Sequence, residues 1–221
     1  DANYYNRDAR DGFEKKEGEP SSGSGAFTDL QELISFVNDA SDEEFAKTIA
    51  DKIALNEFMD WWALVRYTEA GDSAGKNAYL YNDPKAPLFH YAPWDFNHSL
   101  GQDWMTLRVD YDDGDEFLGA NQLFERILSN PILGPVQASR WRGQLAGVLH
   151  EKNVNARIDE ITDEIALSAE RDWDKWEAEY KSYGGWSWYR GDNWTSYEEE
   201  VVLVKNWVQD RHGWLTELYD E

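Results

Sequence analysis

The stretch that decides the fold is Gly71–Gly101, GDSAGKNAYLYNDPKAPLFHYAPWDFNHSLG. Within it, the apolar runs Ala78–Tyr81 and Leu88–Tyr91 are separated by a segment that contains the turn sequence Asn-Asp-Pro-Lys, and this pattern predicts a β-hairpin. Elsewhere in the chain, most apolar residues recur at helical spacing. The predicted fold is therefore α+β and predominantly helical, with one small hairpin.

Three polar side chains flank the predicted hairpin. Asp72 and Asn77 precede it, and Asp95 follows it. Phosphoryl transfer needs one group that accepts a hydroxyl proton and others that hold a metal ion against the phosphates, and two carboxylates and an amide can supply these. If the three groups converge, they predict a kinase-type site. Each also has an ordinary explanation, because Asp and Asn are common in solvated loops and turns.

Upstream of the hairpin, the sequence predicts two helices. Thr28 and Gln31 form a capping-box pattern at the start of a stripe with helical spacing, Leu30, Leu33, Ile34 and Val37. Ser41 with Glu44 predicts the start of a second, longer helix that runs to about Tyr67. Its predicted buried face consists of Phe45, Ile49, Ile53, Phe58, Met59 and Trp62.

Downstream of the hairpin, the chain is predicted to be helical after one acidic loop. The loop, Asp103–Asp115, does not fit the spacing of a calcium-binding EF-hand, so a solvated loop is favoured. The predicted helices are one from Asn121 to Asn130-Pro131, one over Arg140–Leu149, one over Ala156–Tyr180, and one from Ser196 with a capping box to Glu199. Residues 1–26 are polar and rich in Gly and Ser near their end, so they are predicted to be a loop or linker ahead of a helical lobe, residues 27–221.

Composition excludes several classes of function. Forty-four acidic and 21 basic residues give a net charge of −23, which disfavours nucleic acid and anionic membranes as partners. There is no cysteine, which excludes disulfides and thiolate metal sites. No apolar run approaches the ~20 residues of a membrane span. No histidine has a partner at metal-ligand spacing in the sequence, which contains His90, His98, His150 and His212.

The tryptophans divide into groups with different interpretations. Those on predicted helical stripes are interpreted as core residues: Trp61, Trp62, Trp141, Trp173, Trp176 and Trp207. Trp94 and Phe96, on either side of Asp95, are interpreted as core packing around the loop rather than as groups that stack on a ligand. One aromatic group lies in a predicted loop, where it could bind a carbohydrate or a protein partner: Trp186, Trp188, Tyr189 and Trp194.

The residues around the hairpin resemble those of known kinases. Asp72 and Asn77 are similar to the catalytic loop of protein kinases, and Asp95 is similar to their metal-binding Asp. The sequence from Leu55 to Gly101 also resembles the core of the CotH (spore coat protein H) kinase-like family, through the motifs Asn-Ala-Tyr-Leu-Tyr and Pro-Trp-Asp-Phe-Asn. The downstream segments NQLFERILSNP and KNWVQDRHGWL are similar to the helical tail of that family.

The resemblance implies the C-terminal lobe of an atypical, secreted or cell-surface protein kinase, with the hairpin at its active edge. It implies ATP as co-substrate, Mg²⁺ or Mn²⁺ as the metal, and transfer of phosphate to serine or similar hydroxyls of a protein substrate. Asp72 would be the catalytic base, and the metal ligands would be Asn77, Asp95 and Asn97. Many relatives have a second acid where this chain has Asn97. A kinase also needs an N-terminal lobe with a Gly-rich strand pair and a lysine, and that lobe is expected to be missing from this sequence.

An alternative function belongs to a different class. The family fold could serve as a catalytically inactive, kinase-like scaffold module of an extracellular protein, which the expected absence of the lysine-bearing lobe and the net charge of −23 both favour. Thermal stabilisation of the protein by ATP and Mg²⁺ distinguishes the two functions, because a scaffold would show no such stabilisation.

Overall fold

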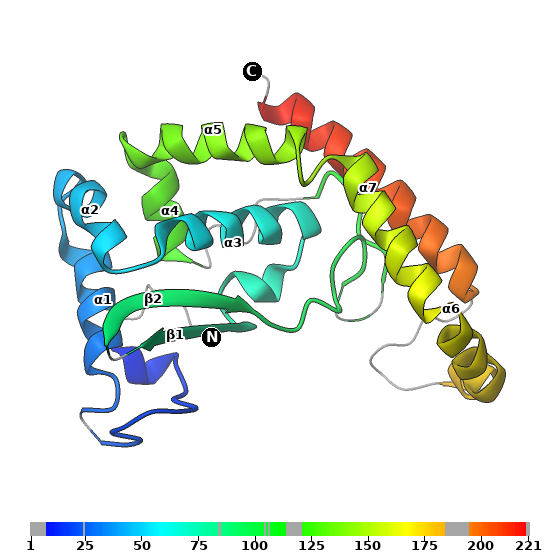
Figure 1. The fold of residues 1–221 in the computed structure, drawn as a ribbon, viewed down its shortest axis with the longest axis horizontal. Coiled ribbons are helices and arrows are strands. Elements are labelled where there is room, and N and C mark those ends of the chain that lie inside the picture. Colours follow the sequence, from blue (N-terminus) through cyan, green and yellow to red (C-terminus); the bar gives the residue numbers. More distant parts are fainter. Residues whose placement is uncertain are drawn as a thin grey trace. The chain divides into compact units, whose positions relative to one another are not determined.

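The computed structural model describes residues 8–23, 25–83, 85–103, 105, 107–113, 121–183 and 195–219, and helices predominate among them (Figure 1). They form two compact units. The hairpin unit comprises Asp1–Arg66, Ala70–Phe96 and Gly114–Arg140, and the long-helix unit comprises Tyr67–Glu69, Asn97–Asp113 and Trp141–Glu221. In the part of the chain that the structure describes, no helix has the length and apolar character needed to span a membrane. The division of the chain at residue 26 stays a prediction.

The hairpin unit contains the only sheet among the described residues, the antiparallel pair β1 (Ala78–Asp83) and β2 (Ala86–Pro93). This pair confirms the predicted hairpin. The helices of the unit are η1 (Ala9–Asp11), α1 (Thr28–Asp39), α2 (Asp42–Thr48), η2 (Ile49–Asp51), α3 (Leu55–Thr68), η3 (Gly71–Ala74), α4 (Gln122–Ser129) and α5 (Leu133–Ala146). Of these, α3 and α5 begin in the hairpin unit and end in the long-helix unit.

The apolar faces predicted for the first two helices are confirmed, but one of the two caps is not. All four residues of the α1 stripe and all six of the next face are buried. Ser41 caps α2 as predicted, with its side chain accepting a hydrogen bond from the Glu44 N–H. The N-cap of α1, however, is Phe27, and Thr28 is already helical, with its Oγ1 donating to the Gly25 carbonyl at 3.1 Å.

The long helix predicted from Ser41 to Tyr67 is wrong, because the chain breaks between η2 and α3. The backbone of Phe89 in β2 accepts a hydrogen bond from Ala54 N at 2.8 Å and donates one to Lys52 O at 2.9 Å. Ile53 thereby forms an isolated parallel bridge with Phe89. The break is set by pairing with a strand more than thirty residues away, so the local helical pattern of the sequence does not reveal it.

The long-helix unit is built on α6 (Glu151–Ser182) and α7 (Tyr197–Tyr219), which lie side by side (Figure 1). Ser196 and Glu199 form the predicted capping box, since Ser196 N donates to the Glu199 carboxylate at 2.7 Å and Glu199 N donates to Ser196 Oγ at 3.2 Å. The predicted ranges of the helices that became α5 and α6 start several residues too late.

Two of the six tryptophans interpreted as core are not buried. Trp61, Trp62, Trp141 and Trp207 are buried as predicted. Trp176 on α6 is 40% exposed and Trp173 is half-buried. The structure buries no residue of α6, so its apolar stripe is not a core face in the described chain.

Gly101 and the segment 109–113 contact α7 through two side chains of that helix. Trp207 Nε1 donates to the Val109 carbonyl at 3.1 Å, and the buried guanidinium of Arg211 donates to the carbonyls of Tyr111 and Asp113 at 2.6 and 2.7 Å. Gly101 has φ of +89° and packs against the indole of Trp207, where an added Cβ would lie 2.6 Å from Cδ1. The side chains of residues 110–113 are exposed, as expected for a solvated loop.

Candidate functional site

Asp72 lies in a short turn, η3, whose backbone accepts hydrogen bonds from two side chains of other segments. The indole Nε1 of Trp61 donates to the Ser73 carbonyl at 2.7 Å, and the amide of Asn121 donates to the Ala74 carbonyl at 2.6 Å. Ser73 and Ala74 of the turn are buried, whereas Asp72 of the same turn is exposed to solvent. Hydrogen bonds from buried side chains therefore fix the backbone of the turn while its carboxylate stays accessible.

The Asp72 carboxylate forms an ion pair with Lys76. The Nζ of Lys76 lies 3.1 Å from Oδ2 of Asp72, and both side chains are more than half exposed. Exposed ion pairs contribute little to stability because water screens them. A metal ion or a substrate hydroxyl can therefore compete with Lys76 for the Asp72 carboxylate, and a phosphate can compete with Asp72 for the Lys76 ammonium group.

Asn77 and Asp95 flank the same end of the β-ribbon, which is the hairpin formed by β1 and β2. The register pairs Ala78 with Pro93, so Asn77 stands one residue before the first pair and Asp95 two residues beyond it. The backbone N–H of Asn77 donates to the carbonyl of Asp72 at 3.0 Å, which connects the turn to the start of β1. This hydrogen bond therefore links the turn that contains Asp72 to the end of the ribbon that Asn77 and Asp95 flank.

Asp95 has an unusual backbone conformation and an exposed side chain. Its φ is +61°, a conformation that costs a non-glycine residue about 1 kcal/mol or more. Its carboxylate has no hydrogen-bond or ion-pair partner among the described residues, and it is exposed. An accessible carboxylate held in this conformation is available to an incoming cation.

The prediction that Trp94 packs in the core is wrong. Its ring is 57% exposed and meets the edge of Tyr79, itself 39% exposed, at a centroid distance of 5.5 Å. Phe96 is half-buried. The end of the ribbon next to Asp95 therefore presents an aromatic pair to solvent.

Asn97 belongs to the long-helix unit. Its side chain is exposed, and its Nδ2 lies 3.0 Å from Nε2 of His98. The metal-ligand role assigned to Asn97 stays a prediction.

These motifs lie inside a match to one protein family. Residues 2–215 match the sequence profile of the family described as CotH kinase protein. The chain belongs to the CotH kinase family. Over 99 residues it is 27% identical to the inner spore coat protein H of Bacillus subtilis (strain 168). That alignment covers 45% of this chain and 27% of the relative.

Membership of the CotH family confirms the resemblance found in the sequence and makes the chain a kinase-like protein. In terms of chemistry, the predicted site residues Asp72, Asn77 and Asp95 offer oxygen ligands, from two carboxylates and one side-chain amide. Such hard ligands are those that Mg²⁺ prefers, usually with several waters and substrate phosphates completing the coordination shell.

The structure also brings together a cluster that the sequence did not predict. Ligand atoms of His150, Glu151 and His212 all lie within 4.8 Å of one another, so the expectation that no histidine has a metal-spaced partner is wrong. His150 and His212 are far apart in the sequence and have no motif spacing, and α6 and α7 must pack before they meet. The adjacent His-Glu pair was the only local signal. The loop aromatic group Trp186–Trp194 lies outside the described residues.

Proposed function

We propose that this CotH-family chain carries the phosphoryl-transfer residues of an ATP-dependent kinase that acts on serine hydroxyls of a protein substrate. The observation that carries the proposal is the shared end of the β-ribbon, from which Asn77 and Asp95 both leave, joined by a backbone hydrogen bond to the turn of Asp72. Family membership supports the reaction class. The chain spans only part of its named relative, so the substrate and the whole reaction are parts of the proposal.

In the proposed reaction, Asp72 orients the acceptor hydroxyl and takes its proton as the oxygen attacks the γ-phosphorus of ATP. A phosphoserine and ADP are the products, because the bond between the γ-phosphorus and its bridging oxygen breaks as the new ester forms. Lys76, which pairs with Asp72, stands where a cation can attract a phosphate oxygen.

Asn77 and Asp95 would hold Mg²⁺ or Mn²⁺. When bound, that ion neutralises charge on the β- and γ-phosphates. Asp95 fits this role because its exposed carboxylate has no partner among the described residues. The exposed rings of Trp94 and Tyr79 provide a surface on which a planar base can stack.

The proposed setting follows that of the relative, which is a spore coat protein. We place this chain, like that relative, at a cell or spore surface or outside the cell. Its partner would be a protein with an exposed hydroxyl, and an N-terminal lobe that supplies further nucleotide contacts would complete the kinase.

The test combines nucleotide binding by this chain with phosphate transfer from γ-labelled ATP by the complete protein that contains it. ATP with Mg²⁺ or Mn²⁺ should raise the melting temperature, and about 100 times the Kd of ligand would add roughly 2.7 kcal/mol of stability. Asp95→Asn should remove the metal-dependent part of that gain. Asp72→Asn should keep binding and lower transfer about 10²–10⁴-fold, as expected for loss of a general base.

The matched control is Asp51→Asn, which neutralises an exposed acid of η2 away from the ribbon end and should change neither readout. If ATP and metal do not stabilise the wild type, or if Asp95→Asn responds as the wild type does, the metal assignment is wrong. Absence of any response would favour the inactive scaffold module.

A further inference from the structure

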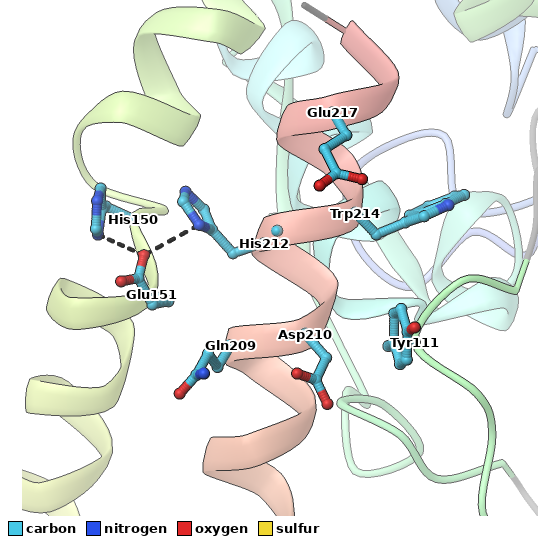
Figure 2. A pocket seen from close by; sticks show the side chains of 9 residues that line it. Tyr111, His150, Glu151, Gln209, Asp210, His212, Trp214 and Glu217 are labelled. Atoms are coloured by element: carbon cyan, nitrogen blue, oxygen red, sulfur yellow. Dashed lines mark ion pairs between the residues drawn. The ribbon is translucent and has the colours of Figure 1, made fainter.

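A cluster of two histidines and one glutamate lies in the long-helix unit and shares no residue with the proposed kinase chemistry. His150 is the N-cap residue of α6, Glu151 is its first residue, and His212 projects from α7. Figure 2 shows both imidazoles directed at the same carboxylate. The Oε2 atom of Glu151 lies 2.7 Å from Nδ1 of His150 and 3.0 Å from Nδ1 of His212.

The other hydrogen bonds of the two rings indicate which nitrogens carry protons. Nε2 of His212 lies 3.0 Å from the Leu145 carbonyl, which can only accept, so Nε2 carries the proton and Nδ1 of the neutral ring has a free electron pair. In His150, Nδ1 accepts the backbone N–H of Lys152 at 3.3 Å and so carries an electron pair as well.

Of the three acceptor atoms, Oε2 of Glu151 and Nδ1 of each histidine, only Nδ1 of His150 receives a hydrogen bond from an N–H group among the described residues, that of Lys152 at 3.3 Å. Oε2 of Glu151 is buried and has no geometrically acceptable hydrogen bond in the described chain. Buried acceptors are costly unless something positive lies between them, either a proton or a cation. The Leu145 carbonyl orients His212 in the same way that carbonyls orient metal-binding histidines, by accepting the proton of the nitrogen that does not bind.

The surroundings favour a cation and give it access from solvent. The cluster contributes to the wall of a pocket of about 580 Å³. Asp210 and Glu217 of α7 line the same pocket, and Figure 2 shows their carboxylates along this helix. The net charge of the chain, −23, adds a general attraction for cations.

We infer that His150, Glu151 and His212 form a binding site for a divalent transition-metal ion of the zinc class. Two imidazole nitrogens and a carboxylate oxygen suit Zn²⁺, whereas Mg²⁺ and Ca²⁺ take oxygen ligands almost exclusively. Three protein ligands leave a fourth tetrahedral position for water or a small ligand. Ligands about 2.0–2.1 Å from zinc lie about 3.3 Å apart. The three ligand atoms lie within 4.8 Å of one another, so a bound ion would draw the most distant of them together by up to about 1.5 Å.

The site would join α7 to the start of α6 with one ion. Its ligands come from two helices whose intervening chain is about sixty residues long, so binding would stabilise the folded long-helix unit. This inference does not depend on the proposed kinase function, since it uses neither Asp72 nor the ribbon end.

The test is a titration of the chelator-treated chain with Zn²⁺ alone, followed by calorimetry and thermal melting, with Co²⁺ as a spectroscopic probe. One ion per chain should bind and raise the melting temperature, and Co²⁺ should give the visible absorption of a tetrahedral site. His212→Ala and Glu151→Gln should each weaken binding at least about 100-fold, because each removes a direct ligand. Far-UV circular dichroism of the isosteric Glu151→Gln variant shows whether its fold is retained.

The matched control is His90→Ala, because Nδ1 of His90 lies 3.0 Å from Glu57 in a pair that lacks a second imidazole. It should leave zinc binding unchanged. Binding that is absent, that is equal in wild type and His212→Ala, or that is lost in His90→Ala would overturn the inference. The inference would also be overturned if acidification raised the melting temperature of the metal-free protein and zinc did not, because the cluster would then hold a proton.

Discussion

Replacing Trp61 by Phe tests how the core of the hairpin unit positions Asp72. Trp61 is 2% exposed, stacks on Tyr91 at a centroid distance of 4.2 Å, and meets Phe124 edge-on at 4.8 Å. Its Nε1 donates to the buried Ser73 carbonyl at 2.7 Å. Phe keeps an aromatic ring between the two neighbours but has no N–H, so the substitution separates hydrogen bonding from most of the packing.

The expected loss of stability is about 2–4 kcal/mol. An unsatisfied buried carbonyl costs about 1–3 kcal/mol, and the void left by the smaller ring adds about 1 kcal/mol. For a chain of this size, that corresponds to a melting temperature lowered by roughly 4–16 °C. Urea unfolding followed by far-UV circular dichroism measures the change in free energy directly.

The control is Tyr91→Phe, which alters the stacked partner instead. The hydroxyl of Tyr91 is buried without a hydrogen-bond partner among the described residues, so removing it should cost less than about 1 kcal/mol. If Trp61→Phe is no more destabilising than Tyr91→Phe, the hydrogen bond to Ser73 does not hold the Asp72 turn, and the reasoning is refuted.

Substitutions at three positions test other parts of the fold. Gly101→Ala should destabilise the chain by about 1–3 kcal/mol, because φ is +89° and the new Cβ would lie 2.6 Å from Cδ1 of Trp207; a thermal melt identical to wild type would contradict this. Burial raises the pKa of Tyr91 above 10.0, so the folded state holds this proton more tightly, and its stabilising effect, complete below pH 10.0, is lost as the pH rises towards the folded pKa. Tyr91→Phe should therefore lose less stability than wild type as the pH rises above about 10, and equal pH slopes there would disprove the assignment. Ser41→Ala should cost about 1 kcal/mol and Ser41→Gly only a few tenths, because only the first leaves a poor N-cap at α2; equal urea midpoints for the two variants would argue against this cap.

Local patterns in the sequence predicted the elements whose cause is local. The stripe of α1 is buried as its helical spacing indicates, and the two apolar runs around Asn-Asp-Pro-Lys form the hairpin. The cap at Ser41 and the capping box at Ser196 also hold, because each involves residues only three positions apart. These features depend on interactions within one turn or one ribbon.

Two of the errors share a physical cause, which is that tertiary contacts between residues distant in the sequence decide the outcome. The helix predicted from Ser41 breaks because Phe89 of β2 takes the hydrogen bonds of Lys52 and Ala54. Trp176 lies on a stripe with helical spacing, but the described chain places no element over that part of α6. The partner of a helix face is a tertiary property, so periodicity identifies the face without showing whether it is covered.

The same distinction separates the two candidate sites. Asp72, Asn77 and Asp95 lie within 24 consecutive residues, and one hairpin brings the last two to the same end of the ribbon, so the sequence alone indicated them. The cluster of His150, Glu151 and His212 exists only once α6 and α7 pack. No local spacing could have indicated it.

The ligand chemistry of the two sites allows their metal responses to be separated in one protein. The ribbon end offers oxygen ligands, which favour Mg²⁺ or Mn²⁺ with nucleotide, whereas the cluster offers two imidazoles and a carboxylate, which favour zinc. Stabilisation by zinc that persists in Asp95→Asn must therefore arise at the cluster. Stabilisation by ATP and Mg²⁺ that persists in His212→Ala must arise at the ribbon end. If either substitution removed both responses, the two sites would not be independent, and the assignment of one metal class to each would fail.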